Sequence, residues 1–248
     1  MDAVVLDHVD KAYTTYGTDI VLTGETRPSR TRQVLRDLSL TIPAGEITVI
    51  VGRSGCGKST LLKLLAGTEM PDTGTIRIPE GWHSAMLSPD PYVITWTSVQ
   101  RNVAMACGVG KTPEERYEHA AEFVRMVGLE DYADLTPVEL STGMKQKASL
   151  AISLVHDPDI IIFDEPTNGL DVLTAKVVTD FLLDLKAQGK TIIVSTHIFS
   201  LIEKICDRVG IIINGHMEAC DTLDAICQGM SLEDRFFEIY KEKAGDIA

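Results

Sequence analysis

The segment ITVIVGRSGCGKSTLLKLLAG, which runs from Ile47 to Gly67, gives the strongest indication of the fold and of the kind of ligand. Its first five residues form a nearly continuous apolar run, which is typical of a central strand in a parallel sheet. A glycine-rich loop, Gly52–Gly57, follows, and Lys58–Ala66 then has helical character. Glycines let backbone N–H groups turn inward around phosphate oxygens, and a helix N-terminus adds positive partial charge there. The segment therefore predicts a phosphate-binding loop between a buried strand and a helix.

The residues of this loop have distinct chemical roles. Positions 52–60 match the pattern G-x-x-x-x-G-K-[ST], with the required strand before it and helix after it. Lys58 would reach the β- and γ-phosphates of ATP, and the Ser59 hydroxyl would ligate Mg²⁺, which prefers oxygen ligands. The other residues of the loop predicted to bind nucleotide are Gly52, Arg53, Ser54, Gly55, Cys56, Gly57 and Thr60.

Two alternatives bear on this loop. A chance glycine-rich turn is disfavoured because the flanking strand and helix are both present. Modification of Cys56 would block nucleotide binding, although a small residue tolerated at a variable position is the simpler interpretation. The loop alone leaves kinases, GTPases and motor ATPases open, so other motifs must decide between them.

Two acidic residues supply the second half of the expected site. The apolar strand Ile160–Phe163 ends in Asp164 and Glu165. At the carboxyl end of a strand beside the phosphate loop, Asp164 can hold Mg²⁺ through water, and Glu165 can orient and deprotonate the attacking water. His197 follows the strand Thr191–Ser195 at the same edge and could hydrogen-bond the γ-phosphate or that water. The alternatives are two acids that begin an ordinary loop, and a structural histidine.

The composition restricts the class of partner. The chain of 248 residues has a formal net charge of -13 and a pI near 4.8, which disfavours binding to nucleic acid. Apolar runs such as Val209–Ile213 are far shorter than the roughly 20 residues that span a bilayer. The first ten residues also lack signal-peptide features, and five cysteines without metal-ligand spacing suggest reduced thiols. We therefore expect a cytosolic chain without a channel of its own.

Hydrophobic patterns divide the chain into regions. Val4–Val9 and Val34–Ile42 alternate apolar and polar residues, as half-buried antiparallel strands do. The polar stretch Tyr16–Arg32 between them is expected to be an exposed excursion. From about Asp90 to Asp157 the pattern is mainly helical, which indicates a helical subdomain inserted into the sheet domain.

Strands alternating with helices return after this region and predict a parallel sheet covered on both faces. The predicted strands are Ile160–Phe163, Thr191–Ser195 and Val209–Ile213, with helices at Val172–Gln188 and Ile198–Cys206. The fold class is therefore α/β, with a mostly parallel sheet core, an antiparallel β subdomain and an inserted helical subdomain. We expect one domain, with 1–88 and 157–248 forming the core and about 89–156 the helical part.

The segment LSTGMKQK, Leu140–Lys147, resembles the signature of ABC ATPases, usually LSGGQ followed by basic and polar residues. It opens a predicted helix about twenty residues before the acidic strand. The phosphate loop, this segment, DEPTNGLD (Asp164–Asp171) and the histidine of STH (Ser195–His197) follow the order and spacing of that family. The chain thus resembles the ATP-hydrolysing subunits of ABC transporters along essentially its whole length, with the P-loop NTPase fold of that family.

The resemblance implies further roles. Two copies, as a homodimer or a heterodimer, would bury ATP head to tail, with Ser141, Gly143 and Met144 of one copy facing the γ-phosphate held by the other. Asp171 would lie in a loop, Asn168–Asp171, that crosses this interface and contacts nucleotide. Tyr13 matches the aromatic that stacks on adenine, with a core aromatic as the alternative and Tyr16 as the fallback. A membrane permease would be the partner, and the chain would lie at the cytoplasmic face of the membrane.

Departures from the family pattern bear on transport direction and coupling. Thr142 and Met144 give an STGM form that resembles ABC-2-type exporter ATPases, whereas GRSGCGKSTLLKLLAG resembles sulfonate- and nitrate-importer ATPases. Export is our first interpretation, import the alternative, and a non-transport ABC ATPase the third. Pro89 or Ser88 stands where relatives have a glutamine, which predicts slower or differently coupled hydrolysis. The permease is expected to dock near Pro89–Trp96.

Overall fold

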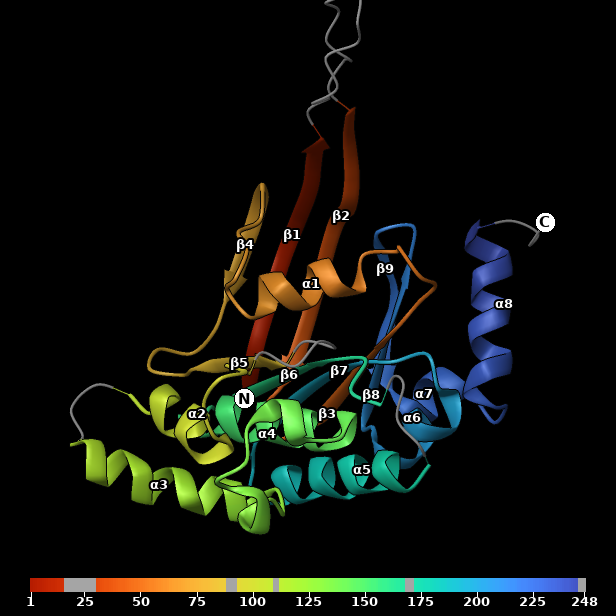
Figure 1. The fold of residues 1–248 in the computed structure, drawn as a ribbon. Helices are drawn as coiled ribbons and strands as arrows, with labels where there is room; N and C mark the ends of the chain where they lie inside the picture. The colour runs from red at the N-terminus through yellow and green to blue at the C-terminus, as the bar shows by residue number, and fades with distance from the viewer. Residues whose placement is uncertain (16–29, 88–92, 109–111, 168–171, 245–248) are drawn as a thin grey trace, which may run out of the picture.

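The computed structural model describes residues 1–15, 30–87, 93–108, 112–167 and 172–244, and its strands form two sheets (Figure 1). A three-stranded antiparallel sheet has the order β2-β1-β4, and a six-stranded sheet has the order β5-β6-β7-β3-β8-β9. The strands are β1 (Asp2–Thr15), β2 (Arg30–Pro43), β3 (Ile47–Val51), β4 (Thr73–Arg77), β5 (Ser84–Leu87), β6 (Ile160–Asp164), β7 (Thr191–Ser195), β8 (Arg208–Ile213) and β9 (His216–Thr222).

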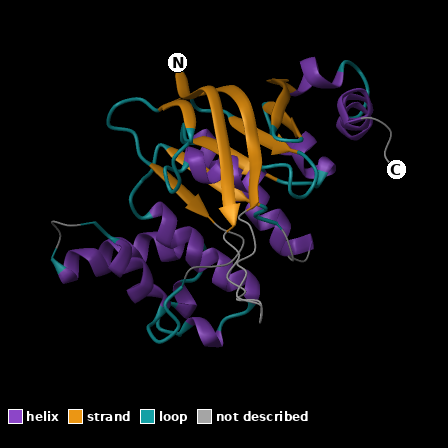
Figure 2. Cartoon of the chain, turned by 90° about the horizontal axis from the view of Figure 1, so that it is seen from above, coloured by secondary structure: helices purple, strands orange, loops and turns teal. Residues whose placement is uncertain are grey.

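Helices lie on both faces of the six-stranded sheet, as the alternating pattern predicts. They are α1 (Lys58–Leu65), α2 (Val99–Ala106), α3 (Pro113–Met126), α4 (Thr142–Leu154), α5 (Val172–Ala187), α6 (Phe199–Ile205), α7 (Leu223–Cys227) and α8 (Leu232–Ala244), with short 3₁₀ turns at Glu130–Tyr132 and Pro137–Glu139. Seen from above, the strands form one body with most helices on one side and the C-terminal helix on the opposite side (Figure 2).

The central strand β3 explains the apolar run that opens the phosphate loop. It pairs in parallel with β7 on one side and β8 on the other, and all of its residues are buried. Because successive side chains of a strand point to opposite faces, Val49 packs in the cluster beneath the helical layer and Ile50 in the cluster around α1. Both faces of β3 are therefore covered, which fixes the end of the strand from which the loop departs.

Helix α1 lies between the two sheets and joins them. It has only eight residues, a length at which an isolated helix is marginal in water. Four leucines, Leu61, Leu62, Leu64 and Leu65, are buried against both sheets, and each contributes about 1.5–3 kcal/mol of hydrophobic stabilisation. Tertiary packing therefore holds the N-terminus of α1 in place behind the phosphate loop.

The helical layer forms from α2, α3 and α4, which pack on one another (Figure 1). Thr112 begins α3 with a capping box, in which its hydroxyl accepts from the Glu115 N–H at 3.2 Å and the Glu115 carboxylate accepts from the Thr112 N–H at 2.7 Å. The helical character expected between about 90 and 156 is present, and the proposed domain boundaries there stay a prediction.

The structure corrects one boundary in the antiparallel sheet. The stretch expected to be an exposed excursion, Tyr16–Arg32, ends in strand, because β2 already begins at Arg30. Arg32 pairs with Tyr13 and Thr31 with Thr14, so backbone hydrogen bonds continue where the side chains are polar. The remaining part of that stretch lies outside the described residues.

The C-terminal part is built on a tight hairpin. Asn214 and Gly215 have φ values of 50° and 87°, as the Asn-Gly turn between β8 and β9 requires. Helix α8 then packs back through Leu232, Phe236 and Ile239. The short helix α7 was not predicted from the sequence. Among the residues that the structure describes, none of the helices has both the length and the apolar character that crossing a bilayer requires.

Candidate functional site

The phosphate loop leaves β3 and enters α1 through two glycines, Gly52 and Gly57, at which an added Cβ would clash with neighbouring atoms. A Cβ at Gly52 would lie 2.5 Å from the Ile212 carbonyl oxygen. Gly57 has a φ of 115°, and a Cβ there would lie 2.7 Å from a methyl group of Leu35. Without side chains, the backbone can wrap tightly and turn its N–H groups toward one enclosed space.

Lys58 is held inside this loop. Its side chain is almost buried at 9% exposure, and its Nζ donates to the Gly52 carbonyl oxygen at 2.8 Å. No carboxylate among the described residues lies within ion-pair distance of this ammonium. A buried cation without a counter-ion is costly unless an anion joins it, so the loop is preorganised for a phosphate group.

A cavity of about 670 Å³ opens beside the loop and collects most of the predicted site. It is lined by Arg32, Val34, Gly52, Arg53, Ser54, Gly55, Gly57, Lys58, Ser59, Thr60, Asp164, Glu165 and His197. These residues come chiefly from the carboxyl ends of three neighbouring parallel strands, β3, β6 and β7, which meet at one edge of the sheet. The cavity therefore places three cationic side chains, hydroxyls, two acids and an imidazole around one space.

Asp164 is fixed by a residue that our sequence analysis did not assign. Its carboxylate is 6% exposed, and one oxygen accepts from the Ser195 hydroxyl at 2.5 Å. The same hydroxyl accepts from the backbone N–H of Glu165 at 3.1 Å. Ser195 thus orients the first acid and the backbone of the second. Its place directly before Thr196 and His197 at a strand end was the only signal in the sequence.

Glu165 and His197 form a hydrogen-bonded pair that faces the cavity. The His197 Nδ1 lies 2.9 Å from Glu165 Oε2, and the two side chains are 64% and 18% exposed. Because the carboxylate only accepts, Nδ1 must carry the hydrogen, which leaves Nε2 for another partner. Glu165 also has a φ of 51°, a conformation that is costly for a residue with a Cβ and that is found preferentially at functional sites.

Tyr13 does not line the cavity in this structure. It is 37% exposed, and its hydroxyl donates to the Glu69 carboxylate. Partial burial, and then this hydrogen bond, raise the pKa of the Tyr13 phenol. Its strand partner Arg32 and the nearby Val34 line the cavity instead, although neither was predicted. The stacking role of Tyr13 stays a prediction.

The signature segment lies apart from the cavity of its own chain. Ser141 caps α4 by accepting from the Met144 N–H at 3.3 Å, and it is exposed, whereas Met144 packs partly against the core. Neither Ser141, Gly143 nor Met144 lines the cavity. Asp171, with the loop 168–171, and the positions Ser88 and Pro89 lie outside the described residues.

Comparison with known proteins places these features in one family. The ABC transporter family model matches residues 35–168. The chain is 37% identical to the aliphatic sulfonates import ATP-binding protein SsuB of Cupriavidus pinatubonensis, over 81% of the chain and 72% of that protein. It is 40% identical to the taurine import ATP-binding protein TauB of Pseudomonas aeruginosa, over 72% of the chain and 70% of that protein.

Solved structures agree with this assignment. An ATP-binding subunit of an ABC transporter superposes with a TM-score of 0.78 at 26% identity, over 96% of this chain and all of that one. The dimeric cassette MJ0796, in a post-hydrolysis state with ADP and phosphate, superposes with a TM-score of 0.75 at 26% identity, over 89% and 98%. The chain therefore belongs to the ATP-binding subunits of ABC transporters, and it is an ATPase coupled to transport.

Proposed function

We propose that this chain hydrolyses ATP to power uptake of a sulfonate-type solute through a separate membrane permease. The observation that carries the hydrolysis is the convergence of Lys58, Asp164, Glu165 and His197 on one cavity. The observation that favours uptake is that the relatives described above are named as import proteins for sulfonates and taurine. The interpretation as an exporter, which rests on the STGM form of the signature, has less support than import.

The reaction follows from the placement of the side chains. The loop N–H groups and Lys58 would hold the β- and γ-phosphates, where they stabilise the charge that develops as the terminal phosphoryl group leaves. Glu165 would orient a water and take its proton. The His197 Nδ1–H bond fixes that carboxylate. Nε2 would donate to the γ-phosphate in the imidazolium form of the ring, in which both nitrogens carry hydrogen.

The residues present also suit a magnesium ion. Ser59 offers an exposed hydroxyl beside Lys58, and Asp164 offers the carboxylate oxygen that Ser195 does not occupy. Such oxygen ligands are those that Mg²⁺ prefers, with water and phosphate completing its octahedron. When bound, the ion would neutralise phosphate charge in the transition state.

Replacing Ser195 tests how Asp164 is held. In Ser195→Ala, the Asp164 carboxylate loses the bond that fixes its orientation, so we expect roughly a 10- to 100-fold loss of Mg²⁺ affinity or activity. The measurement is the ATPase rate as a function of Mg²⁺ concentration. Ser149→Ala, which removes another buried hydroxyl on α4, should leave that curve unchanged. An unaltered Mg²⁺ dependence in Ser195→Ala would remove Ser195 from the site.

Arg32 is proposed to contact the nucleotide beside the stacking aromatic Tyr13. In Arg32→Gln, loss of a partly solvated charged contact should weaken ATP binding roughly 2- to 13-fold, which corresponds to the 0.5–1.5 kcal/mol of a typical hydrogen bond. The check is a titration with a non-hydrolysable ATP analogue. Arg30 lies on the same strand but does not line the cavity, so Arg30→Gln should bind the ATP analogue as tightly as the parent chain.

Two copies are proposed to complete each site, as a homodimer or as a heterodimer with another such ATPase. The exposed Ser141 lies outside the cavity of its own chain, and a dimeric cassette is among the similar structures. A hydroxyl and backbone N–H groups at a helix start form an anion site that needs a phosphate from elsewhere. The pair would lie at the cytoplasmic face of the membrane, bound to its permease.

A vesicle experiment tests the direction of transport. The chain and its co-purifying permease are reconstituted in vesicles with the ATPase facing outward, and ATP is added outside. Import predicts that taurine or an alkanesulfonate loaded inside moves out to the side of the ATPase. Movement of these solutes from the ATPase side into the vesicle would instead establish export. If neither solute moves, although a permease that couples to hydrolysis is present, the sulfonate assignment is wrong.

A further inference from the structure

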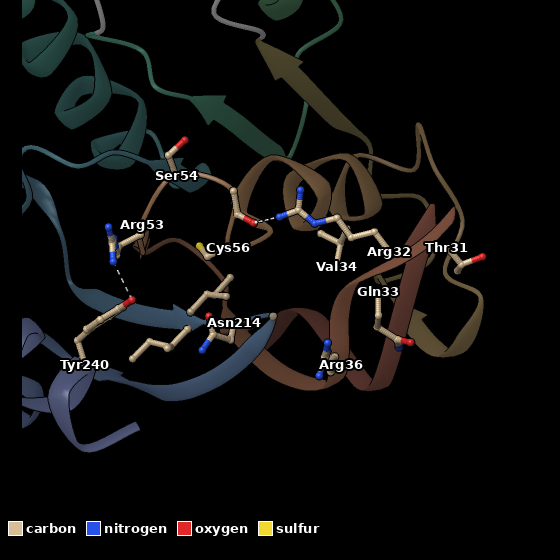
Figure 3. A pocket seen from close by; sticks show the side chains of 14 residues that line it. Thr31, Arg32, Gln33, Val34, Arg36, Arg53, Ser54, Cys56, Asn214 and Tyr240 are labelled. Carbon is tan, nitrogen blue, oxygen red and sulfur yellow. Dashed lines mark hydrogen bonds between the residues drawn. The ribbon is translucent and has the colours of Figure 1, made fainter. Parts of the chain in front are cut away.

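A second cavity, of about 800 Å³, adjoins the first along the phosphate loop (Figure 3). Its walls come from β2, the loop, the Asn214–Gly215 turn and α8, which are far apart in sequence. It is lined by Thr31, Arg32, Gln33, Val34, Arg36, Arg53, Ser54, Gly55, Cys56, Ile212, Ile213, Asn214, Gly215 and Tyr240. The first cavity, which contains Lys58, Asp164 and Glu165, is called the nucleotide cavity. The second cavity alone is lined by Arg36, Asn214 and Tyr240.

The charged side chains that line this second cavity are all positive. Arg32, Arg36 and Arg53 line the cavity, and no aspartate or glutamate does, although the chain carries a net charge of -13. No described carboxylate lies within ion-pair distance of any of the three guanidinium groups. The Arg36 side chain has no hydrogen-bond partner among the described residues, and Arg32 donates only to the Gly55 carbonyl oxygen at 3.3 Å. Guanidinium groups without counter-ions in a concave wall are a binding surface for an oxyanion.

Tyr240 adds a neutral donor to this surface. The Arg53 guanidinium donates to the Tyr240 hydroxyl oxygen at 3.0 Å and lies 5.5 Å from its ring centroid (Figure 3). Because the hydroxyl accepts from Arg53, its own hydrogen remains to be donated. That hydrogen has no acceptor among the described residues.

The walls are held in place independently of any ligand. The Arg36 backbone N–H donates to the Gly215 carbonyl oxygen at 2.9 Å, which ties β2 to the β8–β9 turn. Helix α8 is anchored by the buried Leu232, Phe236 and Ile239, so Tyr240 is presented from a packed helix. A preorganised wall loses little conformational entropy when a ligand binds.

We propose that this cavity binds a small anion through a tetrahedral oxyanion group, namely phosphate, sulfate or sulfonate. Arg53 and Tyr240, which lie together, hold the group by a charge-assisted and a neutral hydrogen bond, and Arg36 adds positive charge from the far wall (Figure 3). The volume lies within the range of about 300–1,000 Å³ that is usual for small-molecule sites, so an organic substituent fits beside the group. A zwitterion such as taurine is disfavoured, because its ammonium would meet three guanidinium groups and no carboxylate.

The test must separate this cavity from the phosphate loop, which itself attracts such anions. The full chain is first saturated with a non-hydrolysable ATP analogue and Mg²⁺. Sulfate, inorganic phosphate, methanesulfonate and taurine are then titrated by calorimetry, with ionic strength kept constant by chloride. We expect saturable binding of one or more of the first three at one site per chain, with taurine at least tenfold weaker. The anion that binds tightest identifies the group.

Variants assign the site. Tyr240→Phe removes the neutral donor and should weaken anion binding roughly 2- to 13-fold, the value of a typical hydrogen bond. It should leave affinity for the ATP analogue unchanged, because Tyr240 does not line the nucleotide cavity. Arg36→Gln, which removes a charge from the far wall, should weaken anion binding by less than about fivefold. Arg77→Gln removes the same charge from the exposed face of β4 and should bind anion normally. Lys58→Met, titrated without nucleotide, should keep the anion site. An anion affinity that is unchanged in Tyr240→Phe, or no saturable binding at all in the parent chain, would overturn the proposal.

Discussion

Glu165→Gln is expected to lower the steady-state ATPase rate by roughly 10²- to 10⁴-fold, the range that a general base contributes. The amide cannot take a proton from water, yet its oxygen can still accept from His197 Nδ1, so the geometry at 2.9 Å is kept. Affinity for ATP should therefore change less than about twofold, well below the tenfold that 1.4 kcal/mol represents. Phosphate release measures the rate, and equilibrium titration measures the affinity.

The same variant also tests the proposed pairing of two chains. If Ser141 of one copy contacts the γ-phosphate held by another, ATP that is not hydrolysed should keep the copies together. Size-exclusion chromatography with ATP and Mg²⁺ should then show a dimer for Glu165→Gln and a monomer for Glu165→Gln combined with Ser141→Arg. A dimer that persists in the double variant would mean that the α4 start does not contribute to the interface.

A matched carboxylate separates catalysis from charge. Glu122 lies exposed on α3, outside the nucleotide cavity, and Glu122→Gln removes the same charge. This control should hydrolyse ATP at the parent rate. Should Glu165→Gln retain the parent rate as well, another group must activate the water, and the assignment of Glu165 is wrong.

The part of the site that the sequence predicts is the part encoded locally. A strand, a glycine-rich loop and a helix are contiguous between Ile47 and Ala66, so their chemistry can be read without knowing the fold. The proximity of Asp164, Glu165 and His197 could also be predicted, because parallel strands that end in polar residues bring those residues to one edge. Their convergence in one cavity agrees with that expectation.

The residues that sequence reasoning missed depend on long-range packing. Arg53 and Tyr240 meet across 187 positions, because α8 folds back through apolar contacts that no local motif specifies. Ser195 was invisible for another reason. A serine at a strand end has many uses, and only the register of β6 beside β7, which pairs Asp164 with Ser195, selects its bond to the acid.

The direction of transport shows a different limit of prediction from short motifs. Thr142 and Met144 differ from the common signature, and our export reading gave weight to those two positions. Identity summed over most of the chain instead relates it to proteins named for import. Both residues lie in the first turn of α4, where Ser141 supplies the cap, so they change little of the local fold. They are therefore weak indicators of which permease the chain serves.

Lys58→Met should weaken nucleotide binding strongly. The ammonium is held by the Gly52 carbonyl oxygen and has no carboxylate partner among the described residues, so its attraction to phosphate is not shared with another acid. A hydrogen bond to a charged group contributes about 1.5–3 kcal/mol, which predicts a roughly 10- to 150-fold loss of ATP affinity. Hydrolysis should fall further, because Lys58 would also stabilise charge in the transition state.

Thermal unfolding shows whether the loss of ATP affinity in Lys58→Met is confined to the site or reflects a less stable fold. Methionine is apolar and of similar length, and removing a buried, unpaired charge should leave the stability of the nucleotide-free chain equal or higher. The increase in melting temperature that ATP gives the parent chain should disappear, because that increase depends on ligand concentration relative to its Kd. Lys63 lies five positions further along α1 and its side chain is exposed. Lys63→Met should therefore keep both the ATP-induced increase in melting temperature and the ATPase activity. If Lys58→Met binds ATP as tightly as the parent, the loop does not hold the phosphates through this residue.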